Sequence, residues 1–331
     1  MVPFDARHTT LAVFDESHGQ ANWSQTGFTA RQMHANFSGV AELLSRLGCQ
    51  CHRHTQKPLH PALPHTQLLV IPTPTGAYDA VSECWRRDRA SLFEPDEIFD
   101  ILGFLKNGGR LLAFAYRFGD SFTQTNLGQL FSPLGCLLND DAILDLMQLK
   151  APNPLATHFH TTVGDLPSVW SVAGIRELRW RCLATFSILP GTKAWPLVLS
   201  PALGSLSYHA RLRQISYQPL PLGVAGISGN GRFALFGGPH AFETSPLGLL
   251  DRADNARFLR HVLVWLLAET WPQRRAVPPG LFGNPRDAGD WLWRPFRSDD
   301  KAQDGPSVAF VEELLRQGET LHALPIEKWS V

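Results

Sequence analysis

The sequence predicts an α/β protein built on a doubly wound, mostly parallel β-sheet, with an irregular insertion and a C-terminal extension. Short apolar runs typical of buried strands alternate with amphipathic segments at helical spacing. The connections between them are short, as in βαβ units. The 331 residues, 44% of them hydrophobic, exceed the usual size of one domain and supply a large core.

The elements follow from local signals along the chain. Apolar runs closed by polar or Pro-containing loops indicate strands, and the run at 49–54 has the mixed character of an edge strand. A central helix is predicted to begin at an acidic segment with Pro95 near its first position. It is predicted to end at Asn107-Gly108-Gly109. Strands are predicted at residues 10–14, 49–54, 67–71, 110–115, 135–138 and 231–238, and helices at residues 40–47, 94–105, 125–131, 255–267 and 307–316.

The βα pattern predicts one domain over residues 9–269, with an insertion at about 152–223 where prolines and tryptophans cluster. Residues 270–331 form a Pro-, Gly-, Arg- and Trp-rich extension. Its residues Trp291, Trp293 and Phe296 are predicted to dock on a protein partner, since aromatic residues and arginines dominate interface hot spots. The alternative is a strap packed on the chain's own domain.

Composition excludes several classes of function. Thirty basic and thirty acidic side chains leave no net charge to attract nucleic acid. No signal-peptide pattern opens the chain and no run of eighteen apolar residues predicts a membrane span, so a cytoplasmic location is expected. An odd number of scattered cysteines favours reduced thiols: Cys49, Cys51, Cys84, Cys136 and Cys182.

Polar residues follow the predicted strands, and parallel sheets bind ligands at the carboxyl ends of their strands. In one interpretation Asp15 or Glu16 pairs with Arg117, and His18 or His240 titrates near neutral pH in a pocket for a small polar ligand. In the other, these side chains cap helices and satisfy loop backbone. The candidate pocket residues are Asp15, Glu16, His18, Thr73, Thr75, Tyr116, Arg117 and His240.

No metal site or cofactor is predicted. In a strand at 49–54, the two cysteines and the two histidines point to opposite faces and do not converge. His158 and His160, two residues apart, could share a site at a strand edge with a carboxylate. The chain lacks the paired CxxC or HExxH spacing that is typical of zinc sites. The Gly229-Asn230-Gly231 segment precedes a strand and predicts a hairpin turn, and the chain has neither GxGxxG nor a Walker lysine.

Four motifs occur together in the order of a known superfamily. They are FDESHG at Phe14–Gly19, LLVIPTP at Leu68–Pro74, DEI with LGFLKNGGRLLAFA within Asp96–Ala115, and GRFALFGGPHAF with DNARFLRHVLVWL within Gly231–Leu266. The chain resembles the class I glutamine-amidotransferase-like superfamily, as in trehalose-utilisation-type proteins and in domains of gliding-motility and intraflagellar-transport components. This resemblance implies a flavodoxin-like, Rossmann-like fold from about Thr9 to Glu269.

The resemblance also implies where catalysis would occur. Active members place a cysteine at a tight elbow after the strand equivalent to residues 110–115. Here the elbow reads Ala115-Tyr116-Arg117-Phe118-Gly119-Asp120, and Ser121 lies beyond the turn. No His-x-Glu pair follows the late strand, where His240 stands as a lone histidine. A glutaminase mechanism is therefore not expected.

Two functions remain open from the sequence. The first is a non-catalytic ligand- or protein-binding scaffold component of a bacterial multi-protein system. The second is a hydrolase or small-ligand enzyme that uses Asp15, Glu16, His18 and Arg117 at the strand ends. Glutamine hydrolysis that is lost on replacing one of the five cysteines would contradict the first.

Overall fold

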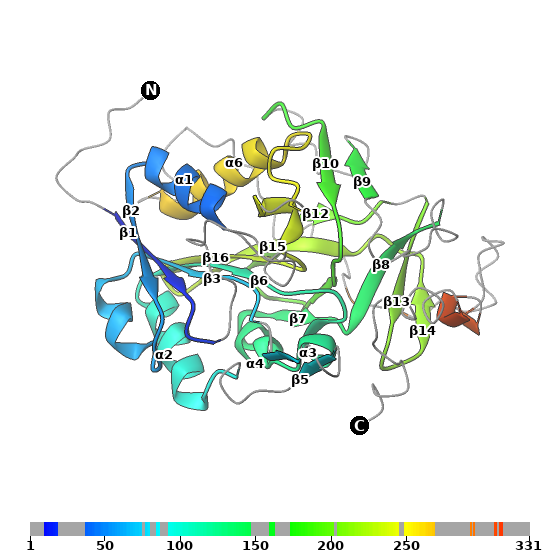
Figure 1. Cartoon of the computed structure of the whole chain (residues 1–331), viewed down its shortest axis with the longest axis horizontal. Coiled ribbons are helices and arrows are strands. Elements are labelled where there is room, and N and C mark those ends of the chain that lie inside the picture. The colour runs from blue at the N-terminus through cyan, green and yellow to red at the C-terminus, as the bar shows by residue number, and fades with distance from the viewer. Residues whose placement is uncertain are drawn as a thin grey trace.

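The computed structural model describes residues 10–18, 37–74, 77–79, 84–86, 92–146, 159–162, 173–201, 204–244, 248–268, 292, 294, 308–309 and 311–313. A seven-stranded sheet forms its centre, and helices cover both faces of that sheet (Figure 1). The mixed α/β class with a large, mostly parallel sheet is the one predicted from the sequence.

The central sheet has the strand order β12-β15-β16-β6-β3-β1-β2. Its strands are β1 (Thr10–Asp15), β2 (Cys49–His54), β3 (Leu68–Ile71), β6 (Arg110–Phe114), β12 (Ala194–Leu199), β15 (Pro221–Ser228) and β16 (Gly231–Phe236). The pairings among β2, β1, β3, β6 and β16 are parallel, and β12 and β15 join antiparallel at one edge. Because β12 belongs to this sheet, part of segment 152–223 completes the main sheet.

Alternating side chains of the strands feed two cores. Phe14, Phe114 and Phe236 point to the face covered by α1 (Ser38–Arg46) and α6 (Asn255–Leu267). The intervening strand residues point to the opposite face, which α2 (Pro95–Lys106) and α4 (Leu127–Phe131) cover. The parallel pairing of β1, β3, β6 and β16 places their carboxyl ends at the same edge of the sheet.

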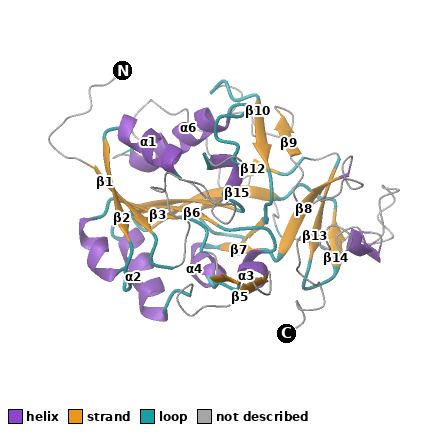
Figure 2. Cartoon of the chain, viewed as in Figure 1, coloured by secondary structure: helices purple, strands orange, loops and turns teal. Residues whose placement is uncertain are grey.

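A second, three-stranded sheet lies beside the first (Figure 2) and consists of β8 (Asp141–Asp145), β13 (Ser205–His209) and β14 (Gln214–Ser216). Its apolar core also contains Phe118 and Phe122, which follow strand β6 in the chain. Smaller elements are the strand pairs β7 (Cys136–Leu138) with β11 (Phe186–Ile188), β9 (Phe159–Thr162) with β10 (Glu177–Trp180) and β4 (Ala77–Asp79) with β5 (Cys84–Arg86), the helix α3 (Gly119–Thr123), and the 3₁₀ segments η2 (His60–His65), η4 (Ser132–Leu134) and η7 (His240–Phe242).

The hairpin predicted at Gly229-Asn230 is confirmed, because β15 and β16 pair antiparallel up to Ser228 and Gly231. Residues 308–309 and 311–313 are helical, and Val311 is fully buried against the second sheet. Trp291, Trp293 and Phe296 lie outside the described residues. Within the described part of the chain, no helix has the length and apolar character that a membrane crossing needs.

Candidate functional site

The predicted pocket residues do lie at the carboxyl ends of parallel strands, but they form two separate clusters. Asp15, Glu16 and His18 follow β1, at one side of the sheet. Tyr116 and Arg117 follow β6 and meet His240, which follows β16. Thr73, after the intervening β3, donates its hydroxyl to the Ala115 carbonyl and ties two of the strand ends together. Thr75 lies outside the described residues.

The first cluster is centred on His18, whose ring is fully buried. Its Nδ1 lies 2.7 Å from Asp15 Oδ2, and its Nε2 lies 3.2 Å from Glu97 Oε2. The ring stacks on Phe93 with centroids 3.9 Å apart. Ser17 adds a hydrogen bond from its hydroxyl to Asp15 Oδ1 at 2.6 Å.

Internal contacts account for each polar atom of this network. Glu97 accepts the backbone N–H groups of Leu59 and of Glu94, the latter as part of a capping box at the start of α2. Burial raises the pKa of the Asp15 carboxyl, but the hydrogen bonds from His18 and Ser17 outweigh it and leave the pKa below its usual value. The cluster fixes the β1 loop to α2, which matches the interpretation of loop-satisfying side chains.

The expected pairing of Asp15 or Glu16 with Arg117 is not the arrangement observed. Asp15 bonds His18, as described, and Glu16 forms an ion pair with Arg53 of β2. Arg117 instead lies over the rings of Tyr116 and Phe122, with its Cζ 5.6 and 5.1 Å from their centroids. Of the predicted set, the structure thus brings Tyr116, Arg117 and His240 together in one cluster and Asp15 and His18 together in the other.

The second cluster contains a partner for His240 that the sequence analysis did not find. His240 Nδ1 lies 2.6 Å from Glu243 Oε2, and both side chains are buried. The short 3₁₀ segment η7 brings the two together, because residues three apart share a face of such a helix. His240 is therefore not a lone histidine but half of a His-x-x-Glu pair. Its Nε2 lies 3.4 Å from the Tyr116 hydroxyl.

A cysteine completes this cluster. Cys182 is hydrogen-bonded to His240 and lies 3.9 Å from a guanidinium nitrogen of Arg117. It comes from the turn after β10 and has a left-handed backbone, with φ of 53°. For a residue other than glycine, this conformation costs energy and is found disproportionately at functional sites.

Two glycines at the end of β16 allow the cysteine segment to approach. A Cβ on Gly237 would stand 1.9 Å from the Ala184 carbonyl oxygen, and one on Gly238 would stand 2.7 Å from that of Cys182. The Ala184 N–H donates to the Gly237 carbonyl at 3.0 Å, which anchors the segment on the strand end. The Gly-Gly pair therefore determines how close the thiol lies to His240.

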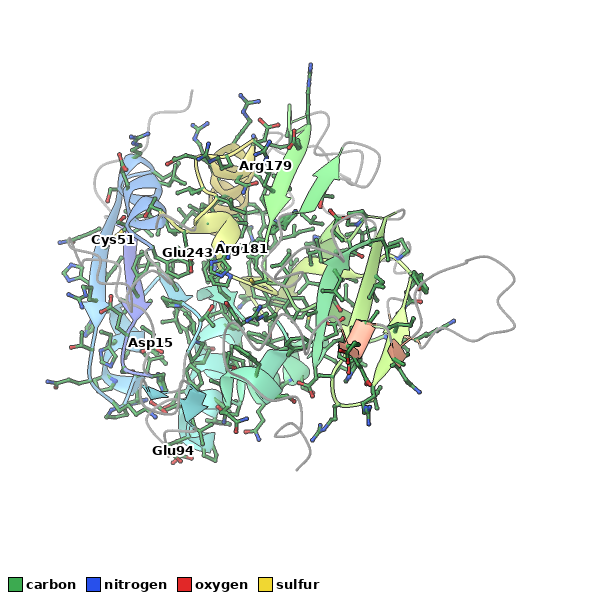
Figure 3. The ribbon with its side chains drawn as sticks, turned by 45° about the vertical axis from the view of Figure 1, so that its right-hand side comes forward. Asp15, Cys51, Glu94, Arg179, Arg181 and Glu243 are labelled. Carbon is green, nitrogen blue, oxygen red and sulfur yellow. The ribbon has the colours of Figure 1, made fainter. Side chains whose placement is uncertain are left out.

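Charges around the thiol favour its ionised form. Burial by itself raises the pKa of Cys182, but Arg117, His240 and Arg181 outweigh it and lower the pKa to about 6. Burial lowers the pKa of His240, yet Glu243 and the other groups around the ring raise it well above its ordinary value. Both shifts favour the same ion pair, a thiolate beside an imidazolium. Figure 3 shows Arg181 and Glu243 near the centre of the molecule, away from Asp15.

Unused hydrogen-bonding capacity remains in this cluster. Glu243 Oε1 and Arg181 Nε are buried, and neither has a hydrogen-bond partner among the described residues. Tyr116, Arg117 and Arg181 are partly exposed, whereas Cys182 keeps 6% of its surface exposed. Within the described residues, no three histidine, cysteine or acidic side chains gather in a way that would hold a metal ion.

The turn after β6 holds Phe118, at the place where the sequence resemblance puts a nucleophile elbow. Phe118 occupies it in a left-handed conformation, with φ of 58° and ψ of 18°. Its ring is 1% exposed and packs near Phe122 and Tyr208, with centroids 6.3 and 6.4 Å away. The position thus anchors the second sheet.

The residues that sequence reasoning missed are Glu97, Cys182, Arg181 and Glu243. A His-x-x-Glu spacing before a helix was a readable signal for Glu243. Cys182 was one of five scattered cysteines, and no local pattern distinguished it from the others. The four cysteines with described side chains, Cys49, Cys51, Cys136 and Cys182, are free thiols.

No protein-family model matches the chain, and no curated protein matches it. Among solved structures, it is similar to the mmIFT52 N-terminal domain, with a TM-score of 0.56 and 17% identity, covering 78% of this chain and 97% of that one. A cytoplasmic protein from Salmonella typhimurium aligns with a TM-score of 0.46 and 16% identity over 78% and 98% of the two chains. A ThuA-like protein from Bacteroides uniformis aligns at 0.42 and 12% over 86% and 98%. The likeness to the mmIFT52 domain is one of fold.

Proposed function

We propose that this chain is a binding domain of a multi-protein system, built on an amidotransferase-like sheet that no longer acts as a glutaminase. The observation that carries the proposal is Phe118 at the elbow. A phenyl ring cannot act as a nucleophile, and Phe118 is buried in the apolar core of the second sheet. The turn that carries Phe118 instead stabilises the second sheet.

The site residues support the same reading. Asp15, His18 and Glu97 satisfy one another inside the protein, and Glu16 is bound to Arg53. A hydrolase built on Asp15, Glu16, His18 and Arg117 would need these groups to converge on one substrate. They lie in two clusters instead, so this alternative has less support than the binding role.

The protein partner is proposed to dock through Trp291, Trp293 and Phe296 of the C-terminal extension. A cytoplasmic location and a bacterial assembly stay predictions from the sequence. Affinity purification of the full chain from its host, followed by binding of the captured protein in purified form, tests the docking. Replacing the three aromatic residues with alanine should abolish that binding, whereas Phe99→Ala, at an exposed aromatic on α2, should leave it unchanged.

The loss of glutaminase activity has its own test. Incubation of the full chain with glutamine should produce glutamate no faster than a buffer control. Glutamate formation above that background, lost on replacing any one cysteine, would overturn the proposal. Equal capture of the partner by the wild type and the triple alanine variant would move the docking site elsewhere on the chain.

A further inference from the structure

We propose that Cys182, His240 and Glu243 form a nucleophilic acyl-transfer site, in which the Cys182 thiolate takes an acyl group from a substrate that carries a negative charge. This goes beyond the binding role and does not rest on it. The thiol comes from the turn after β10, a different segment from the elbow that carries Phe118.

The three side chains have the relative positions that such chemistry requires. A thiol nucleophile needs a base within hydrogen-bond reach, and the base needs a third group that orients it. Here Cys182 is hydrogen-bonded to His240, and Glu243 holds the other side of the ring at 2.6 Å. The carboxylate accepts from Nδ1–H and so keeps the ring oriented.

The charge around the thiol indicates the kind of substrate. Within the described part of the cluster, three cations, Arg117, Arg181 and His240, face two anions, Cys182 and Glu243. The excess positive charge suits an anionic ligand. Guanidinium groups bind carboxylates with paired hydrogen bonds, and Arg181 Nε is buried with no partner among the described residues.

The reaction balances with water as the only co-reactant. The thiolate attacks the carbonyl carbon of an ester, and the collapse of the tetrahedral intermediate breaks the bond to the leaving alkoxide, which takes the imidazolium proton of His240. A thioester on Cys182 remains. Water then attacks the thioester carbonyl, gives a proton to the neutral His240, and releases the acid and the thiolate.

Two activated esters provide the probe: para-nitrophenyl acetate, which is neutral, and para-nitrophenyl hydrogen succinate, which is anionic. Full-length protein should release about one nitrophenolate per chain in a burst, and mass spectrometry should place the acyl group on Cys182. Cys51 serves as an internal control, because it is more exposed while burial raises the pKa of its thiol. Preferential acylation of Cys51 or of lysines would overturn the proposal.

Variants then separate nucleophile activation from substrate charge. His240→Gln should slow acylation of Cys182 by roughly 10²–10⁴-fold, the usual contribution of a general acid or base. Arg181→Met should slow the reaction with both esters, because Arg181 helps to lower the pKa of Cys182, and it should slow the reaction with the succinate more than that with the acetate. Equal rates in His240→Gln and the wild type would contradict the proposal. Because the internal comparison with Cys51 uses only the wild type, a variant that fails to fold does not leave the question open.

Discussion

The Glu243 carboxylate lies 2.6 Å from His240 Nδ1, with both side chains buried beneath the strand end of β16. This contact turns a histidine that the sequence places alone into a charged group. Since His240 in turn stabilises the Cys182 thiolate, the carboxylate acts on the thiol through the imidazole ring. The electrostatics of the cluster therefore depend on a residue that makes no described contact with the thiol itself.

Glu243→Gln should make the Cys182 thiol less reactive. Loss of the carboxylate lowers the pKa of His240. A neutral His240 no longer favours the thiolate, so the pKa of Cys182 rises. Alkylation by iodoacetamide just above pH 6 should slow by about tenfold for each unit of that rise. Glu97→Gln removes the corresponding buried carboxylate beside His18 and is the matched control. An unchanged alkylation profile in Glu243→Gln would count against this coupling.

Phe118→Ala should destabilise the chain by about 3–5 kcal/mol, the usual cost of removing a buried phenyl ring. The ring joins the elbow to the second sheet, so its loss leaves a cavity between the two sheets. Urea denaturation gives the free energy of unfolding. Phe99→Ala, at a ring that is 75% exposed, should change that free energy by less than about 0.5 kcal/mol. Similar values for the two variants would show that Phe118 does not anchor the second sheet.

Asp141 makes the stability of the protein depend on pH. Burial raises the pKa of its carboxyl from 3.8 to about 7, even though Thr185 and Ser207 donate hydrogen bonds to it. Because the folded-state pKa lies above the unfolded value, this contribution is fully present below pH 3.8 and is lost as the pH rises to about 7. The loss amounts to at most roughly 4 kcal/mol.

Asp141→Asn should remove that dependence, because the amide resembles the protonated acid and keeps acceptor and donor positions for Thr185 and Ser207. Melting temperatures across this pH range should fall for the wild type and change less for the variant. The exposed Asp251→Asn is the control. A variant whose melting temperature follows pH as steeply as that of the wild type would show that Asp141 is ionised in the folded chain.

Val311 and Glu312 pack on the second sheet. Val311 is fully buried, and Glu312 accepts hydrogen bonds from Tyr208 and forms an ion pair with Arg213. Val311→Ala should therefore lower the free energy of unfolding by about 1–2 kcal/mol, at roughly 0.8 kcal/mol for each buried methylene. Val264→Ala, at a valine that is 41% exposed, should have a smaller effect. Equal effects would mean that this segment contributes little to folding.

Local sequence signals predicted most of the central sheet. The runs at 67–71 and 110–115 are apolar and closed by turn residues, and the stop at Gly108-Gly109 ends α2 where predicted. The second sheet was not predicted, because β8 and β13 are about sixty residues apart and the apolar run of β8, Ala142 to Leu144, does not alternate with polar residues. Its stability comes from contacts with Phe118 and Val311, which only the folded chain brings together.

Only part of the candidate site could be predicted from the sequence, for the same reason. The rule that ligands bind at strand ends located Tyr116, Arg117 and His240. It did not predict that His18 would bond Glu97, which is 79 residues away, and so belong to a structural network. Cys182 reaches His240 because Gly237 and Gly238 leave room for its backbone, which is a packing relationship that no local pattern reports.

The ionisation of Cys182 is the most direct test of the account, since the site depends on a thiolate at neutral pH. The measurement is the ultraviolet absorbance of the thiolate as a function of pH, taken as the difference between the wild type and Cys182→Ser. The midpoint should lie near pH 6, well below the ordinary thiol value of 9.0. A midpoint at or above that ordinary value would contradict it.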